Sequence, residues 1–148
     1  MSIARWLHIT GVVIWVGGMF FAHMALRPSV QALAPPQRLP LLSATLTRFI
    51  VWAGASVVAI VGSGIAMLTL AGGFAAVNWA IHAMTAVGAV MTLVYAYLAA
   101  VPLQRLRSAV AGAQWADAGA AMAKVRPLVA FNLALGLVTI AIAVLGRG

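Results

Sequence analysis

The first hydrophobic run, Ile3 to Leu26, constrains this chain most, and it carries two of the three histidines in the sequence. A helix rises about 1.5 Å per residue, so a run of this length can cross a hydrocarbon core of about 30 Å. Because an imidazole is costly to place against lipid, His8 and His23 must face other protein segments. The run therefore predicts a retained transmembrane helix that packs against further helices.

The composition places the whole chain in the membrane class. Hydrophobic residues make up 65% and charged residues 7% of the 148 positions, far outside the range of soluble domains. The net charge of +8 would suggest nucleic-acid binding in a soluble domain. Here the lysines and arginines lie at helix ends and between helices, so we expect no nucleic-acid partner. Cysteine is absent, which excludes disulfides, thiolate metal ligands and cysteine nucleophiles.

Four apolar runs predict an all-α fold, an up-and-down four-helix transmembrane bundle that forms one domain over residues 1–148. The expected helices cover residues of about 3–26, 48–71, 77–101 and 127–145. The more polar segments 27–47 and 102–126 are expected to be loops, with a short surface helix in the second. The glycine- and serine-rich face of the second helix would permit close approach to another copy in a homodimer.

The distribution of basic residues predicts the orientation of the bundle. Seven of the nine Lys and Arg lie in or beside the segments 27–47 and 102–126, whereas Arg5 and Arg147 lie on the other side. By the positive-inside rule these two segments face the cytoplasm. We therefore expect a multi-pass protein of a bacterial inner membrane, surrounded by lipid, with both termini in the periplasm.

Two histidines fall at a similar depth on alternate helices. His8 lies near the outer end of the first helix, and His82 lies near the outer end of the third. Helices one and three are diagonal in an up-and-down bundle, so their side chains can converge on its axis. Two neutral imidazoles in this arrangement would hold the iron of a b-type haem.

Further residues would complete such a haem site. Gly11 and Thr85, each three residues beyond its histidine, would leave room for the flat macrocycle. Arg5, one turn outward of His8, would pair with a haem propionate. The alternative is that each histidine only forms a hydrogen bond across the bundle or handles protons.

His23 lies roughly 22 Å further along the first helix than His8 and belongs to a second, inner layer. At that level the sequence also places Arg48, Tyr97 and Asn132, and the four residues together predict a hydrogen-bonded polar cluster. A second haem, a quinone head group or a proton site are the alternatives for this layer.

The methionines open a different interpretation of the metal chemistry. Met19 shares a helix face with His23, and thioether and imidazole ligands suit Cu(I). Methionine is also an ordinary apolar filler of hydrophobic cores. Copper bound by histidine and methionine is therefore the alternative to haem.

The first helix, WLHITGVVIWVGGMFF followed by LRP, resembles the amino-terminal motif of the CopD-like (copper-resistance protein D-like) membrane family. The later runs HAMTAVGAVMTLVYAYLAAVPLQRLRSAV and LVAFNLALGLVTIAIAV resemble the small stand-alone members of that family. The resemblance implies a small helical membrane protein with an association to copper handling.

The same segments are similar to the HemJ-type protoporphyrinogen oxidases, which are small four-helix haem-binding proteins. The matching residues are His8, Trp15 and Gly18 in the first helix and Trp79 and His82 at the start of the third. This resemblance implies haem b ligation by His8 and His82, and it adds Trp15 to the expected cofactor-binding residues.

Met84 departs from the pattern of those oxidases. They carry His-Ala-Lys with a functionally important lysine where this chain has His82-Ala83-Met84, so an ionisable group is missing. The expected function is thus haem-dependent electron transfer, with a quinol or a small redox protein as partner, and porphyrinogen oxidation is a further alternative. An enzymatic role would be that of a membrane oxidoreductase of the cytochrome b type, and the sequence singles out no catalytic residue.

Overall fold

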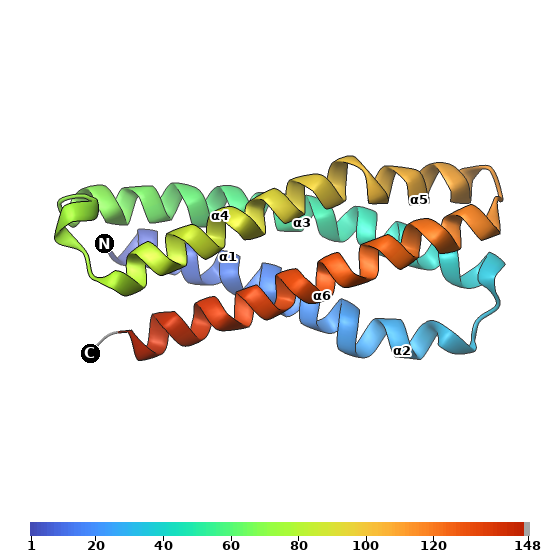
Figure 1. Cartoon of the computed structure of the whole chain (residues 1–148), viewed down its shortest axis with the longest axis horizontal. Coiled ribbons are helices and arrows are strands. Elements are labelled where there is room, and N and C mark those ends of the chain that lie inside the picture. The colour runs from blue at the N-terminus through green and yellow to red at the C-terminus, as the bar shows by residue number, and fades with distance from the viewer. Residues whose placement is uncertain (147–148) are drawn as a thin grey trace.

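The computed structural model describes residues 1–146 as an elongated bundle of long antiparallel helices (Figure 1). Its elements are α1 (Ser2–Phe20), the π-helical η1 (Phe21–Leu26), α2 (Arg27–Ser29), the 3-10 helix η2 (Val30–Ala32), α3 (Pro35–Leu70), the 3-10 helix η3 (Phe74–Ala76), α4 (Trp79–Ala100), α5 (Pro102–Ala111) and α6 (Trp115–Leu145). These elements join into four rods, each long and apolar enough to cross a membrane. The predicted all-α four-helix transmembrane bundle is confirmed for this part of the chain. Arg147, which was counted on the outer side, lies outside the described residues.

The helices are longer than the sequence predicted. The segments 27–47 and 102–126, expected to be loops, are helical over most of their length, with Pro40 inside α3 and Pro127 inside α6. A proline removes one hydrogen bond of the helical ladder, but packing against neighbouring helices compensates for that loss. The 36 residues of α3 would span roughly 54 Å, well beyond a hydrocarbon core of about 30 Å. The bundle therefore continues past the membrane on one side.

A leucine-rich core holds this extension together. Leu39 and Leu42 of α3, Leu103 and Leu106 of α5 and Val125 of α6 are all buried. The two leucines of α3, and likewise the two of α5, are three residues apart, the spacing of an amphipathic helix whose other face is polar. The polar side chains that favoured a loop in the sequence thus lie on the solvent-facing sides of packed helices.

The first rod contains a π-helical turn just before Pro28 and stays helical beyond it. η1 follows the π-helical pattern, and the N–H of Arg27 donates to the carbonyl oxygen of Ala22, five residues earlier. Pro28 follows directly within α2, so the helix does not end at Arg27 and Pro28 but continues through η2 to Ala32. His23 lies inside the π-helical turn. Such turns are rare and occur frequently at functional sites.

The packing of the rods defines which helices are diagonal. α1 packs mainly along α3, α4 and α5 pack mainly along α6, and α1 also touches α6. Within residues 1–146 the first rod makes at most weak contact with the rod formed by α4 and α5. The start of α1 and the end of α6 lie at one end of the bundle, opposite α2 and α5 (Figure 1). The outer ends of α1 and α4 therefore lie on diagonal rods at the same end of the molecule, as the sequence predicted.

Tyr95 connects α4 to α3 in the middle of the bundle. Its hydroxyl donates to the carbonyl oxygen of Ile50 over 3.1 Å, and its ring meets Trp15 edge-on with ring centroids 6.1 Å apart. Tyr95→Phe should lower the free energy of unfolding by about 0.6 kcal/mol, the usual size of one interhelical hydrogen bond in a membrane. Tyr97→Phe is the matched control and should change nothing, because Tyr97 is 52% exposed. Unfolding curves in detergent measure both variants, and an equal loss in both would contradict a role for the Ile50 hydrogen bond.

Candidate functional site

His8 lies on α1 with its ring against α3. Its Nδ1 atom is 3.1 Å from the carbonyl oxygen of Ile60 and 3.1 Å from Oγ of Ser63. The ring lies beside Gly64, where an added Cβ would stand 3.6 Å from Cε1 of His8, an ordinary van der Waals contact. Ser63 is buried and donates its own hydroxyl proton to the carbonyl of Ala59 or Ile60. The ring is thus held from α3 on its Nδ1 side.

These partners determine the tautomer of His8. The carbonyl oxygen of Ile60 can only accept, and the Ser63 hydroxyl has already used its proton, so both partners require a proton on Nδ1. In the neutral ring Nε2 then carries the free lone pair. No hydrogen-bond partner for Nε2 is found within residues 1–146. Metal-bound histidines usually have this arrangement, with one nitrogen bonded to the protein and the other to the metal.

His82 lies in the first turn of α4, at the same end of the bundle as His8. It is exposed, and its ring stacks on Phe74 of η3 with centroids 5.5 Å apart and planes 27° apart. Phe74 was not singled out from the sequence, although it follows Gly72 and Gly73, whose φ values of +95° and +85° mark a turn that favours glycine. The connection between α3 and α4 therefore supplies an aromatic surface beside His82.

The two imidazoles are supported by different neighbours. The contacts of His8 run to α3, whereas the ring contact of His82 is with η3. Thr85, one turn after His82, is exposed and donates to the carbonyl oxygen of Ile81 over 2.8 Å. The convergence of the two histidines on one haem stays a prediction, and the diagonal placement of α1 and α4 is compatible with it.

Gly11 does not leave open space, contrary to the expectation for a haem cavity. It is buried, and a Cβ at this position would lie 2.8 Å from Cγ1 of Ile60 and 3.1 Å from the carbonyl oxygen of Ser56. The side of α1 that carries Gly11 packs on α3, so the missing side chain permits close helix approach. Trp15 is buried against Tyr95, and Arg5 is exposed near the amino terminus.

The four residues expected in the inner polar layer do not form one cluster. Asn132 is buried in the core, where its side-chain N–H donates to the carbonyl oxygen of Met91 over 3.4 Å. Arg48 and Tyr97 are exposed, and His23 is half-buried in η1. No hydrogen bond joins any two of the four within residues 1–146. The prediction placed them at a common depth but took no account of the direction in which each side chain leaves its helix.

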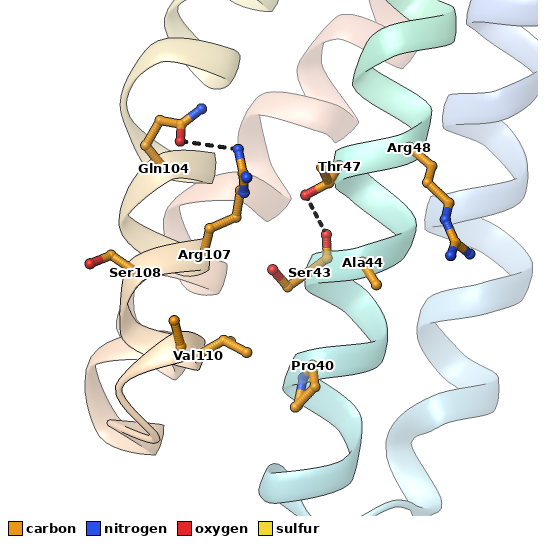
Figure 2. Close-up of a pocket in the computed structure, with 10 residues that line it drawn as sticks. Pro40, Ser43, Ala44, Thr47, Arg48, Gln104, Arg107, Ser108 and Val110 are labelled. Carbon is orange, nitrogen blue, oxygen red and sulfur yellow. Dashed lines mark hydrogen bonds between the residues drawn. The ribbon is translucent and has the colours of Figure 1, made fainter.

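A hollow of about 710 Å³ lies on the side of the extension, between α3 and α5 (Figure 2). Polar groups of Ser43, Thr47, Gln104 and Ser108 line it, together with Arg107, which donates to Gln104 over 3.3 Å. It opens far from His8 along α3. The side chain of Arg48, which also borders it, points away from α5 (Figure 2). None of the histidines lines this hollow.

The donor set limits which metal sites the bundle can hold. Within residues 1–146 no three histidine, cysteine, aspartate or glutamate side chains come together as a metal site would require. A single oriented histidine fits a metal site in which the other bonds to the metal come from a macrocycle or from thioethers. Met67 offers such a thioether by helix register, because it lies one turn beyond Ser63 on the same face of α3.

The comparison with protein families gives one match, to the model described as copper resistance protein D (CopD), over residues 43–145. The matched region includes α4 with His82 and begins after α1, so it leaves His8 outside. No curated protein and no solved structure matches the chain. Since the match covers more than two thirds of the sequence, the chain is a multi-pass membrane protein that belongs to the CopD family.

Proposed function

We propose that this CopD-family protein binds b-type haem near the outer end of the bundle and transfers electrons, and that His8 and His82 would hold the iron. The observation that carries the proposal is the orientation of His8. Its Nδ1 donates to Ile60 and Ser63, which leaves the lone pair of Nε2 for iron. His82 has an exposed ring on the diagonal rod at the same end.

The roles of the protein residues follow from their positions. Ser63 and Ile60 hold the imidazole of His8 in one tautomer, and Phe74 supports the ring of His82. Arg5 is exposed one turn outward of His8, where its guanidinium would meet a haem propionate. A bound haem would supply one-electron redox chemistry, and His8 and His82 would hold it in place. A quinol or a small redox protein would then exchange electrons with it.

The location of the protein is part of this proposal. The described basic residues other than Arg5 lie toward the end of the bundle that is formed by α2, the start of α3, α5 and the start of α6 (Figure 1). By the positive-inside rule that end faces the cytoplasm, and both termini face the periplasm of a bacterial inner membrane.

Copper is the second candidate, and the family match favours it. The matched family is described as copper resistance protein D. The Nε2 of His8 and the thioether of Met67, one turn from Ser63, are ligand types that suit Cu(I). This alternative needs only residues of α1 and α3.

The optical spectrum of the purified protein separates the two candidates. A haem protein should show a Soret band and, after reduction with dithionite, sharp α and β bands, with about one iron per chain and no copper. Copper binding predicts a colourless protein that retains copper after dialysis. For this test the protein must be expressed in cells with ample haem precursor. A colourless product from such cells contradicts the haem proposal.

A further inference from the structure

Three arginines from three different helical elements lie together at the inner end of the bundle. They are Arg27 of α2, Arg38 of α3 and Arg126 of α6. Helix α6 packs against α3 and against η1, which directly precedes Arg27, so the positive charges of Arg27 and Arg38 act on Arg126. Gln31 connects two of them, because its amide donates to the carbonyl oxygen of Arg27 and its oxygen accepts from Arg38 over 3.5 Å. We call these three residues the arginine cluster.

Burial distinguishes the arginine cluster from the other basic residues. All three of its side chains are half-buried, whereas the remaining lysine and arginines among residues 1–146 are exposed. The Nε atoms of Arg38 and Arg126 are inaccessible to solvent and have no hydrogen-bond partner. A buried N–H of a charged group without an acceptor is costly, so these two donors require an acceptor that the described chain does not provide.

No acidic side chain neutralises this charge. Asp117 is the only acidic residue of the sequence, and it borders a different hollow with Arg105 and Lys124. Asp117 and Arg126 are nine positions apart on α6, a rise of roughly 13 Å. Three like charges brought together by packing repel one another, and an anion between or beside them would relieve that repulsion.

The depth of the cluster indicates the kind of anion. Arg27 follows His8 by 19 residues on the same rod, which places it roughly 28 Å further along the bundle. This distance is about the thickness of the hydrocarbon core, so the arginine cluster lies at the level of the opposite head groups. Arginine recognises phosphate oxygens with paired N–H donors, which point charges cannot do.

We infer that the arginine cluster of Arg27, Arg38 and Arg126 is a binding site for a phosphate-bearing anion, supplied by the head group of an anionic phospholipid or by a free phosphate compound. Neither the haem proposal nor the copper alternative uses these residues. The site is on the opposite side of the membrane from His8.

The test uses the full chain in a mild detergent and follows its thermal unfolding. Phosphatidylglycerol should raise the midpoint temperature of the wild type, and phosphatidylcholine with the same acyl chains should not. Arg38→Gln and Arg126→Gln should each weaken the apparent affinity for phosphatidylglycerol about tenfold or more, the cost of one hydrogen bond to a charged group. Arg107→Gln, an exposed arginine of the same extension, is the matched control and should respond like the wild type.

A second arm identifies the source of the phosphate. Inorganic phosphate, compared with chloride at equal ionic strength, should have no effect if the site needs a lipid, and should compete with phosphatidylglycerol if a free phosphate compound binds. Arg126→Lys keeps the charge and removes the Nε donor, and it replaces Arg126→Gln in the test if that variant fails to fold. It should bind phosphatidylglycerol more weakly than the wild type. Equal responses to both lipids, or equal losses in the cluster variants and in Arg107→Gln, would overturn the inference.

Discussion

His8→Ala should yield a protein without the Soret, α and β bands of the wild type, and His82→Ala should do the same. Each substitution removes one of the two nitrogen ligands that the proposal assigns to the iron, so we expect the bundle to lose the haem on purification. His23→Ala is the matched control on the same rod as His8. It should keep the full spectrum, because His23 lies in η1 at the inner level.

Spectra of the four proteins, normalised to protein concentration and recorded oxidised and reduced, provide the measurement. Ser63→Ala adds a further comparison, because Ile60 still accepts from Nδ1 of His8 after the hydroxyl is lost. That variant should retain haem and change only the reduction potential. Full haem retention in His8→Ala would exclude His8 as a ligand, and loss in His23→Ala alone would move the site to the inner layer.

Gly11→Ala should lower the free energy of unfolding by about 1–3 kcal/mol, the usual cost of overpacking. The added methyl group would stand 2.8 Å from Cγ1 of Ile60 and 3.1 Å from the carbonyl oxygen of Ser56. The Ile60 side chain can shift, but the Ser56 carbonyl belongs to the backbone of α3, so the two helices must separate. Because α1 positions His8 against the same stretch of α3, the variant should also bind haem less tightly.

Gly17→Ala is the control for this prediction. No heavy atom lies within 4 Å of a Cβ at Gly17, and the residue is exposed on the same helix. Alanine at an open helical position removes the entropic cost of glycine, so this variant should be neutral or more stable by up to about 1 kcal/mol. Unfolding curves of both variants in one detergent measure the difference, and equal stability of the two would show that α1 and α3 adjust without cost.

Hydropathy and length were sufficient for the fold class. A run such as Ile3 to Leu26 has the length and hydropathy of a membrane-spanning segment. In lipid it must be helical, because its backbone has to satisfy its own hydrogen bonds. Four such runs joined in sequence predict an antiparallel bundle, and the diagonal placement of α1 and α4 follows from that topology. The CopD-like motifs were also legible, and the family match confirms them over residues 43–145.

The ends of the helices were less predictable from the sequence. Local rules end a helix at a proline, but Pro28, Pro40 and Pro127 all lie inside rods. Packing across the bundle outweighs one missing hydrogen bond per proline, and no local pattern reports the strength of that packing.

The sequence by itself therefore determined the membrane class, the number of crossings and the presence of histidines that need protein partners. Tertiary structure alone decided that His8 is held through Nδ1 by Ile60 and Ser63, and that Gly11 serves packing. It also decided that the elements carrying Arg27, Arg38 and Arg126 meet at the inner end of the bundle. The physical reason is that hydrophobicity and length are additive along a chain, whereas the direction of a side chain depends on helix rotation, which only contacts between distant residues establish.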